Sequence, residues 1–187
     1  MSDWRTQAKQ FGNEAYEYTH ATLTDLITAA QEKPHALIVV LDHITDVGNL
    51  GAIIRSAEVV GALGVVIPSK RAAQVNEAVF RTSAGAIECL MVAREPNLVA
   101  VLKRLKDEGF WVGGATEHAR HDIWQAPLEG RLVLCMGAED TGLSRLVRET
   151  CDFEFKLPQF GRTQSLNVAS AFTAIAYEYV RRKHASA

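Results

Sequence analysis

Three residues that could do chemistry follow a short apolar run in this chain of 187 residues. Leu37-Ile-Val-Val-Leu41 leads into a polar, glycine-bearing stretch that contains Asn49, Gly51 and Arg55, at spacings of two and four. Gly51 would let the backbone come close to a ligand, and the planar fork of Arg55 could reach over the same crevice. The run therefore predicts a site at a strand end, the alternative being an ordinary turn followed by a solvated arginine.

Two later segments repeat this change from an apolar strand pattern to polar residues. The run 132–144 places Glu139 in a glycine-containing turn, and the run 153–158 is followed by Ser165-Leu-Asn-Val, which contains Asn167. Each residue also has a structural interpretation. Asn49 could simply form a turn, Glu139 could be a solvated loop carboxylate, and Ser165 could be the N-cap of the closing helix.

Together the three segments resemble the signature of the SpoU (TrmH-like) class of RNA ribose methyltransferases. That signature reads N-x-G-x-x-x-R, then G-x-E-x-x-G-L-S, then an I/L-P run and S-L-N-V, and the resemblance covers residues 36 to 183. Further runs resemble the subgroup that methylates a guanosine of large-subunit (23S) ribosomal RNA: Ala73-Gln-Val-Asn76, Ser83-Ala-Gly-Ala-Ile-Glu88 and Glu95-Pro-Asn-Leu98. The chain departs from the family at Asp46-Val47, where Asp-Pro is usual, and at Gln159, where Met is usual.

The resemblance implies an RNA 2′-O-methyltransferase that uses S-adenosylmethionine. A guanosine of 23S ribosomal RNA is the expected substrate, a tRNA guanosine is the second candidate, and a non-catalytic RNA-binding or ribosome-assembly module is the alternative of a different class. A nucleotide-binding oxidoreductase is disfavoured because no G-x-G-x-x-G follows the first predicted strand.

The resemblance also implies which residues bind the cofactor and which act on the ribose. Gly137, Leu157 and Leu166 match the cofactor-binding positions, and a branched side chain at position 137 would occupy space that the cofactor needs. Five residues match the catalytic positions: Arg55, Asn49, Glu139, Ser165 and Asn167. Because arginine is effectively always protonated, we expect Arg55 to fix the ribose-phosphate and stabilise negative charge rather than act as a literal base. The asparagines would orient the ribose and Arg55. Glu139 would not contact the ribose itself but would fix the side chain of Arg55 or of an asparagine.

Strands alternate with helices along the chain, which predicts an α/β fold with a mostly parallel sheet and helices on both faces. The expected strands cover residues 36–41, 64–67, 88–92, 110–113, 131–136 and 153–157, and the expected helices cover about 50–60, 73–82, 97–108, 143–149 and 166–183. The resemblance adds a SPOUT fold with a C-terminal deep trefoil knot, and a homodimer. In the closing helix, a stripe of apolar residues is predicted to be core or dimer interface, with Tyr177, Tyr179 and Val180 as candidates for the dimer surface.

Composition predicts one globular domain, because 48% of the residues are hydrophobic. No apolar run is long enough to cross a bilayer and the start is unlike a signal peptide, so a cytoplasmic protein is expected. Residues 1–33 are interpreted as a leader or linker, with a short capped helix beginning near Thr22, and residues 34–187 as the catalytic domain. Three scattered cysteines predict buried, reduced thiols, and no metal site is expected at His118 and His121.

The net charge of −2 argues against RNA binding by overall electrostatics. Local patches must supply the phosphate contacts, although each cation could equally be a solvated surface charge. The candidates are Lys70, Arg71, Arg81, Arg120, Arg145, Arg148 and Arg162.

Overall fold

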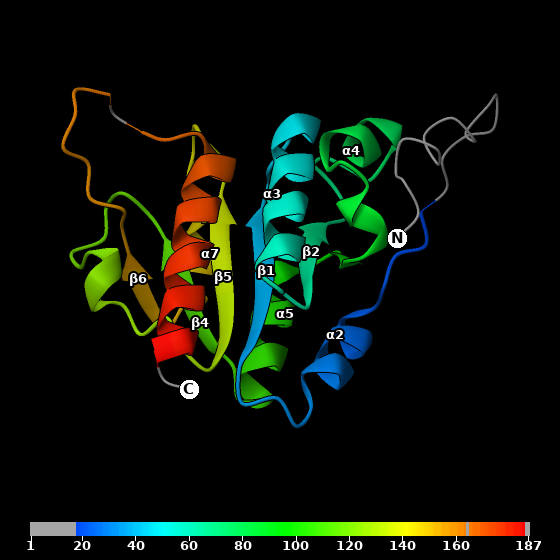
Figure 1. Cartoon of the computed structure of the whole chain (residues 1–187), viewed down its shortest axis with the longest axis horizontal. Helices are drawn as coiled ribbons and strands as arrows, with labels where there is room; N and C mark the ends of the chain where they lie inside the picture. Colours follow the sequence, from blue (N-terminus) through cyan, green and yellow to red (C-terminus); the bar gives the residue numbers. More distant parts are fainter. Residues whose placement is uncertain (1–17, 164, 186–187) are drawn as a thin grey trace.

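A computed structural model describes residues 18–163 and 165–185 of the chain. Within these residues, six parallel strands form one sheet in the order β3-β2-β1-β5-β4-β6 (Figure 1). The strands are β1 (Ala36–Asp42), β2 (Gly64–Pro68), β3 (Met91–Glu95), β4 (Trp111–Ala115), β5 (Arg131–Gly137) and β6 (Phe153–Phe155). Since all strands are parallel, the loops that follow them lie along one edge of the sheet.

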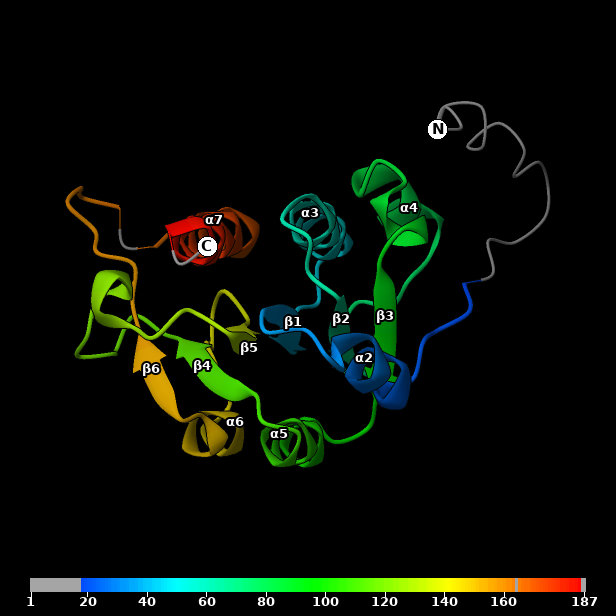
Figure 2. The same ribbon diagram turned by 60° about the horizontal axis from the view of Figure 1, so that its bottom comes forward.

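Helices cover both faces of the sheet, which confirms the predicted architecture. They are α2 (Leu23–Ala30), α3 (Val47–Val59), α4 (Glu77–Thr82), α5 (Leu98–Asp107), α6 (Arg145–Thr150) and α7 (Val168–Ala185), with short 3₁₀ turns η1 (Ala86–Glu88) and η2 (Ile123–Gln125). Figure 2 shows α3, α4 and α7 on one side of the sheet and α5 and α6 on the other. Helix α2 lies on the same side as α5 and α6, and its buried leucines belong to the same core cluster.

The central strand β1 has all seven residues buried, as expected for a parallel strand covered on both faces. Leu37, Val39 and Leu41 pack against the α3 and α7 layer. Ile38 and Val40, which point the opposite way, pack against the α2, α5 and α6 layer. This alternation explains why the run reads as continuously apolar rather than alternating.

Helix α3 begins three residues earlier than its apolar pattern predicts, because Asp46 caps it. The Asp46 carboxylate accepts from the backbone N–H of Asn49 at 2.7 Å. Gly51 therefore lies inside the helix, where a Cβ would stand only 1.9 Å from Thr82 Oγ1 of α4. The expectation that Gly51 opens the backbone to a ligand is wrong; the glycine allows α3 and α4 to approach closely.

Other observed boundaries differ from the predicted ones, mostly because turns and caps occupy residues that were expected in strands or helices. The strand expected at 88–92 is found at Met91–Glu95, because Gly85, with φ +81°, and η1 occupy the residues before it. Helix α4 begins at Glu77 rather than near 73, since the side chain of Asn76 caps it through the N–H of Val79. Strand β6 ends at Phe155, two residues before the predicted end.

The closing helix α7 buries its apolar stripe in the core. Phe172, Ile175 and Tyr179 are all buried, and the Tyr179 hydroxyl donates to the carbonyl of Gly130 at 2.8 Å. The sequence had suggested Tyr179 as part of a dimer surface, and its burial shows that this is wrong. Tyr177, the neighbouring candidate, is 52% exposed. Tyr179 is buried in the core because it lies one helical turn beyond Ile175, on the same face of α7.

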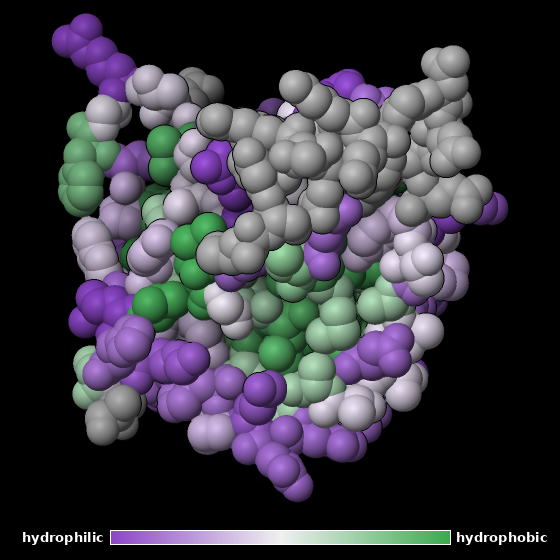
Figure 3. Space-filling model, turned by 45° about the vertical axis from the view of Figure 1, so that its right-hand side comes forward, coloured by the Kyte–Doolittle hydropathy of each residue, from purple (hydrophilic) through white to green (hydrophobic). Residues whose placement is uncertain are grey.

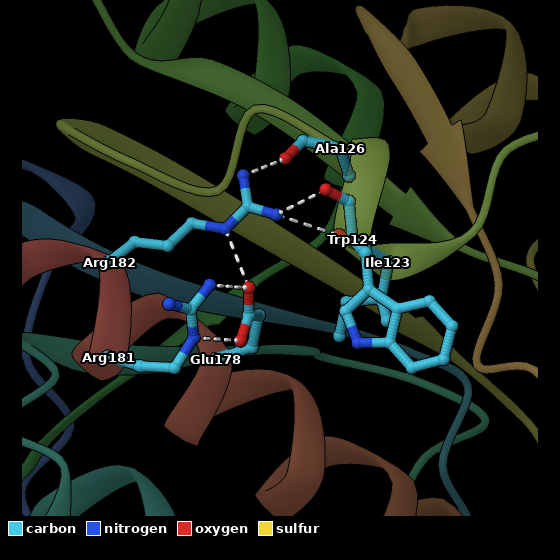
Figure 4. A network of polar contacts seen from close by, with 6 residues as sticks. All are labelled: Ile123, Trp124, Ala126, Glu178, Arg181 and Arg182. Carbon is cyan, nitrogen blue, oxygen red and sulfur yellow. Dashed lines mark hydrogen bonds and ion pairs between the residues drawn. The ribbon is translucent and has the colours of Figure 1, made fainter.

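Polar contacts fasten the C-terminal end of α7 to the connection between β4 and β5 (Figure 4). Arg182 donates to the carbonyl oxygens of Ile123, Trp124 and Ala126. Glu178 accepts from both Arg181 and Arg182, at 2.7 and 2.8 Å. Arg182 therefore binds a neighbouring segment, and both arginines bind Glu178. Cations at the C-terminal end of a helix also interact favourably with the helix dipole.

The N-terminal residues that the structure describes lie along β3. Ala21 donates its N–H to the carbonyl of Val92 at 3.0 Å, and Val92 donates its own N–H to the Tyr18 hydroxyl. Helix α2 begins, as predicted, with a capping box between Thr22 and Asp25. Figure 3, turned toward the side of α2 and α4, shows hydrophobic surface near the middle of the face with mostly hydrophilic surface below it. The division of the chain at residues 33 and 34 stays a prediction.

No helix in residues 18–163 and 165–185 is long and apolar enough to span a membrane.

Candidate active site

Three residues from separate segments meet through their side chains at the carboxyl edge of the sheet. Glu139 Oε1 accepts from Asn49 Nδ2 at 3.0 Å and from Asn167 Nδ2 at 2.8 Å. Asn167 Nδ2 also donates to Asn49 Oδ1 at 2.8 Å, which closes a triangle of polar contacts. The fold thus brings together three of the five residues expected to act in catalysis, and Glu139 contacts the asparagines rather than Arg55.

Local structure at each residue explains the triangle. Asn49 stands in the first turn of α3, held by the Asp46 cap. Glu139 follows β5 by two residues, and Asn167 immediately precedes α7. Asn167 Oδ1 accepts from the N–H groups of Ala169 and Ser170, so Asn167, and not the predicted Ser165, caps this helix. Capping fixes the Asn167 side chain and leaves its Nδ2 to meet Glu139.

A cavity of about 210 Å³ adjoins this triangle. All three residues predicted to bind the cofactor line it: Gly137, Leu157 and Leu166. Glu139 and Ser165 line it as well, whereas Asn49, Asn167 and Arg55 do not. The predicted residues thus divide into a set around the cavity and a set beside it, with Glu139 belonging to both.

Gly137 is required for a reason that the sequence did not reveal. A Cβ at this position would stand 2.1 Å from the carbonyl carbon of Gly142 and 2.3 Å from the nitrogen of Leu143. The loop after β5 therefore folds back against Gly137, and a side chain would displace the loop before it could fill the cavity. A side chain at position 137 would thus meet the protein's own loop first, and not directly the cofactor as the sequence had suggested.

Arg55 lies apart from the triangle although it shares α3 with Asn49. Six residues of α-helix rotate by about 600° and rise about 9 Å, so the two side chains point about 120° apart around the axis. Arg55 is exposed, and its side chain makes no hydrogen bond or ion pair with the residues that the structure describes. Its neighbour Ser56 shares a hydrogen bond of 2.7 Å with Thr173 of α7, so the two helices are joined next to it.

Several residues around the site were not singled out from the sequence. Asp42 ends β1 as a buried carboxylate, and its one signal was an acidic residue closing an apolar run. Glu117 and Asp140 line the cavity together with Glu139. Loop carboxylates of this kind give no periodic signal, so only their position in the fold reveals them.

Three of the seven proposed phosphate-binding cations are already paired. Arg81 pairs with Glu77 and Arg145 with Glu149, each one helical turn away. Arg148 makes two hydrogen bonds to the carboxylate of Glu154, at 2.7 and 3.0 Å. Within the described residues, hydrogen bonds and ion pairs are absent from the other four: Lys70, Arg71, Arg120 and Arg162.

The cysteines are free thiols in three different environments. Cys135 is buried and Cys151 is half-buried, but Cys89 is exposed, so the prediction of three buried thiols is wrong for Cys89. A hydrogen bond with Cys151 and burial raise the pKa of the Cys135 thiol. Among the described residues, no three His, Cys, Asp or Glu side chains are placed to hold a metal ion.

The cavity suits a nucleoside that carries charged groups of both signs. Its wall combines apolar side chains, including Leu157 and Leu166, with backbone groups of the loop after β5, which can recognise a base. Acidic residues (Glu117, Glu139 and Asp140) and basic residues (Arg148 and Lys156) also line it. S-adenosylmethionine has an adenosine part, a cationic sulfonium, a cationic ammonium and an anionic carboxylate, so these residues fit it.

Comparison with known proteins agrees with this geometry. Residues 36–177 match the model of the SpoU rRNA Methylase family. The chain is 43% identical over 171 residues to the TrmH family protein YacO of Bacillus subtilis, a match that covers 91% of this chain and 68% of YacO. It is 39% identical over 167 residues to the 23S rRNA (guanosine-2′-O-)-methyltransferase RlmB of Escherichia coli K12, covering 89% of this chain and 68% of that protein. The chain belongs to the SpoU rRNA methylase family.

Solved structures show the same architecture. The SpoU methyltransferase AviRb from Streptomyces viridochromogenes, in complex with the cofactor AdoMet, has a TM-score of 0.79 at 31% identity, covering 91% of this chain and 68% of that one. An AdoMet-bound rRNA methyltransferase from Sinorhizobium meliloti has a TM-score of 0.78 at 26% identity, covering 89% and 62%. This chain spans about two thirds of the length of the relatives that it matches, from 65% to 68% for the proteins compared by sequence.

Proposed function

We propose that this protein is an S-adenosylmethionine-dependent RNA 2′-O-ribose methyltransferase that acts on a guanosine of 23S ribosomal RNA. The observation that carries the proposal is the contact of Glu139 with Asn49 and Asn167 beside a cavity lined by Gly137 and Leu157. RlmB proteins, named for this reaction, are about 40% identical to the chain and support the choice of substrate. The AdoMet complex of AviRb supports the choice of cofactor.

The proposed cofactor would supply an electrophilic methyl group on its sulfonium sulfur. Gly137, Leu157 and Leu166 would hold its adenosine part, since all three line the cavity. Glu139 would lie at the border between cofactor and RNA, because it lines the cavity and also contacts Asn49 and Asn167. Its Oε2 oxygen accepts no hydrogen bond from the described residues and can receive one from a substrate hydroxyl.

The remaining site residues would orient the ribose and stabilise charge. Asn49 and Asn167 are held rigidly by each other and by Glu139, which favours a fixed geometry for the attacking oxygen. Arg55 would bind the ribose-phosphate and stabilise the negative charge that develops on the 2′-oxygen. Ser165, exposed at the cavity wall, would contact the target nucleotide.

A homodimer would explain why Arg55 lies apart from the cavity. Arg55 is exposed on the outer side of α3, and exposed apolar side chains lie on the same helical layer, Val59 on α3 at 60% and Tyr177 on α7 at 52%. A second copy packed there would cover the apolar side chains and bring its own cavity toward Arg55. Light scattering at micromolar concentration tests this part, and a monomer would contradict it.

Three further expectations complete the proposal. The SPOUT trefoil knot would involve the segment after β4, which bonds to the segment after β6 through Thr116 N–H to Phe155 O and Lys156 N–H to His121 O. Residues 1–33 would form a leader or linker ahead of the catalytic domain at 34–187. A ribosomal RNA substrate would be met in the cytoplasm, which supports the expected cytoplasmic location.

Labelled S-adenosylmethionine and total RNA from a strain that lacks the enzyme provide the test. After incubation with the chain, the modified ribose is mapped, and Arg55→Ala serves as the inactive control. Label on a 23S guanosine is expected, whereas label on tRNA would move the substrate to the second candidate. If no RNA accepts label, the proposed activity is wrong and a binding module is favoured.

A further inference from the structure

Asp42 is the one charged side chain that is buried among the residues that the structure describes, with 1% of its surface exposed. It ends β1, where its side chain points to the face covered by α5 and α6, opposite to Leu41. A carboxylate removed from water costs several kcal/mol unless partners satisfy its oxygens. The contacts of Asp42 therefore decide what this residue does.

Each oxygen of the Asp42 carboxylate has a partner. Oδ1 lies 2.6 Å from Nδ1 of His43, which adopts a left-handed backbone conformation with φ +61°. Oδ2 accepts the backbone N–H of Ser144 at 2.6 Å, across 102 residues of sequence. The second contact is the informative one, because Ser144 ends the loop after β5 and begins α6.

Asp42 holds both ends of that loop. In the sheet its backbone pairs with Gly137, the last residue of β5, and its carboxylate binds Ser144 at the other end. Between these ends the loop closes on itself through the Gly142 N–H to the Ala138 carbonyl, at 2.8 Å. The loop supplies Glu139 to the polar triangle, and its residues 138–143 all line the cavity.

We propose that Asp42 is a positioning residue that fixes the loop 138–143, so that the cavity keeps the shape that binds S-adenosylmethionine. Asp42 touches neither the proposed cofactor nor the RNA; it acts through Ser144 and the loop. This inference rests on the proposed function for the identity of the ligand. Its claim about the loop concerns the protein alone.

Asp42→Asn tests the inference, because the amide has the same shape but lacks the charge that strengthens the bond from Ser144. Ser144→Pro removes the same bond from the donor side, and proline fits the φ of −61° at Ser144. We expect each variant to raise the dissociation constant for S-adenosylmethionine about tenfold by calorimetry. Hydrogen exchange of amides 138–143 should become faster in both.

Asp152→Asn is the matched control. The Asp152 carboxylate also accepts one backbone N–H, from Val112 at 2.8 Å, and pairs with Lys106, but it does not contact the loop. The control should lose thermal stability while its cofactor affinity stays within twofold of the wild type. Unchanged exchange and unchanged affinity in both test variants would overturn the inference. A wild-type chain that binds no S-adenosylmethionine would instead refute the proposed cofactor, and hydrogen exchange would still decide the claim about the loop.

Discussion

Asn167 donates a hydrogen bond of 2.8 Å to Asn49 although the two residues are 118 positions apart. The same Asn167 caps α7 through its side-chain oxygen. One residue therefore begins a helix with one side-chain atom and completes the polar triangle with another. This division of roles allows the two to be separated by mutation.

Asn167→Asp should preserve the start of α7 but disable the site. Aspartate caps helices as well as asparagine does, so the melting temperature should stay close to that of the wild type. The new carboxylate cannot donate to Glu139 and adds a like charge beside it, so methyl transfer should fall by about a hundredfold. Asn167→Ala, which loses the cap too, should also lose about 1 kcal/mol of stability. Full activity in Asn167→Asp would show that the triangle is structural only.

Arg55→Ala should retain cofactor binding and lose methyl transfer by at least about a hundredfold. Arg55 does not line the cavity, so calorimetry with S-adenosylmethionine should give the wild-type affinity. The loss would come from charge stabilisation at the ribose. Arg104→Ala is the control, an exposed arginine on α5 that donates to Thr24. Weakened cofactor binding in Arg55→Ala would assign this arginine to the cavity instead.

Gly137→Ala should damage the loop and, through it, cofactor binding. The added Cβ would stand 2.1 Å from Gly142, and backbone must move to relieve this contact. Overpacking of this kind costs about 1–3 kcal/mol, so both the melting temperature and the cofactor affinity should fall. Gly161→Ala, with nothing within 4 Å of the new Cβ, should change neither. A Gly137→Ala protein with native affinity would refute the tight fold of this loop.

Glu178→Gln should reduce stability in a pH-dependent way. Hydrogen bonding from Arg181, assisted by Arg182, lowers the pKa of Glu178 to about 2 from an ordinary value of 4.5. A carboxyl with a lowered pKa stabilises the fold above the ordinary value and loses that effect as pH falls toward the lowered one. The difference between wild type and Glu178→Gln should therefore be about 1 kcal/mol at pH 7 and vanish near pH 2. Thermal melts across this range give the answer.

Glu149→Gln is the control for that experiment, because Glu149 forms an exposed pair with Arg145. Exposed pairs contribute little, so its melts should follow the wild type at every pH. An equal effect in both variants would show that the contacts of Glu178 are not special.

The sequence predicted the layers well because burial leaves a direct pattern. Leu37–Leu41 is apolar throughout since both faces of β1 are covered, and Val168, Phe172 and Ile175 repeat at helical spacing since one face of α7 is covered. Helix starts were less accurate. Asp46 and Asn76 cap through side-chain contacts that compete with other turn conformations, and no apolar pattern records the outcome.

The motif residues of the site were named from resemblance, but their contacts were not predictable. Nothing in the local sequence shows that Glu139 meets two asparagines rather than Arg55, because that choice depends on how α3 and α7 are placed. Gly51 and Gly137 were both interpreted as space for a ligand. In the fold, each is space for neighbouring protein, Thr82 in one case and Gly142 in the other.

The order of the strands also governs when the site can form during folding. The central pair of the sheet joins β1 to β5, whose first residues, Ala36 and Arg131, are 95 positions apart. Pairings at such separation must overcome a large loop-closure entropy, so folding in milliseconds to seconds is expected rather than in microseconds. During synthesis on a ribosome, β1 cannot pair with β5 until β5 has emerged. The polar triangle cannot form until Asn167 has emerged as well. The three residues can therefore meet only after Asn167, the last of them in the sequence, has been synthesised.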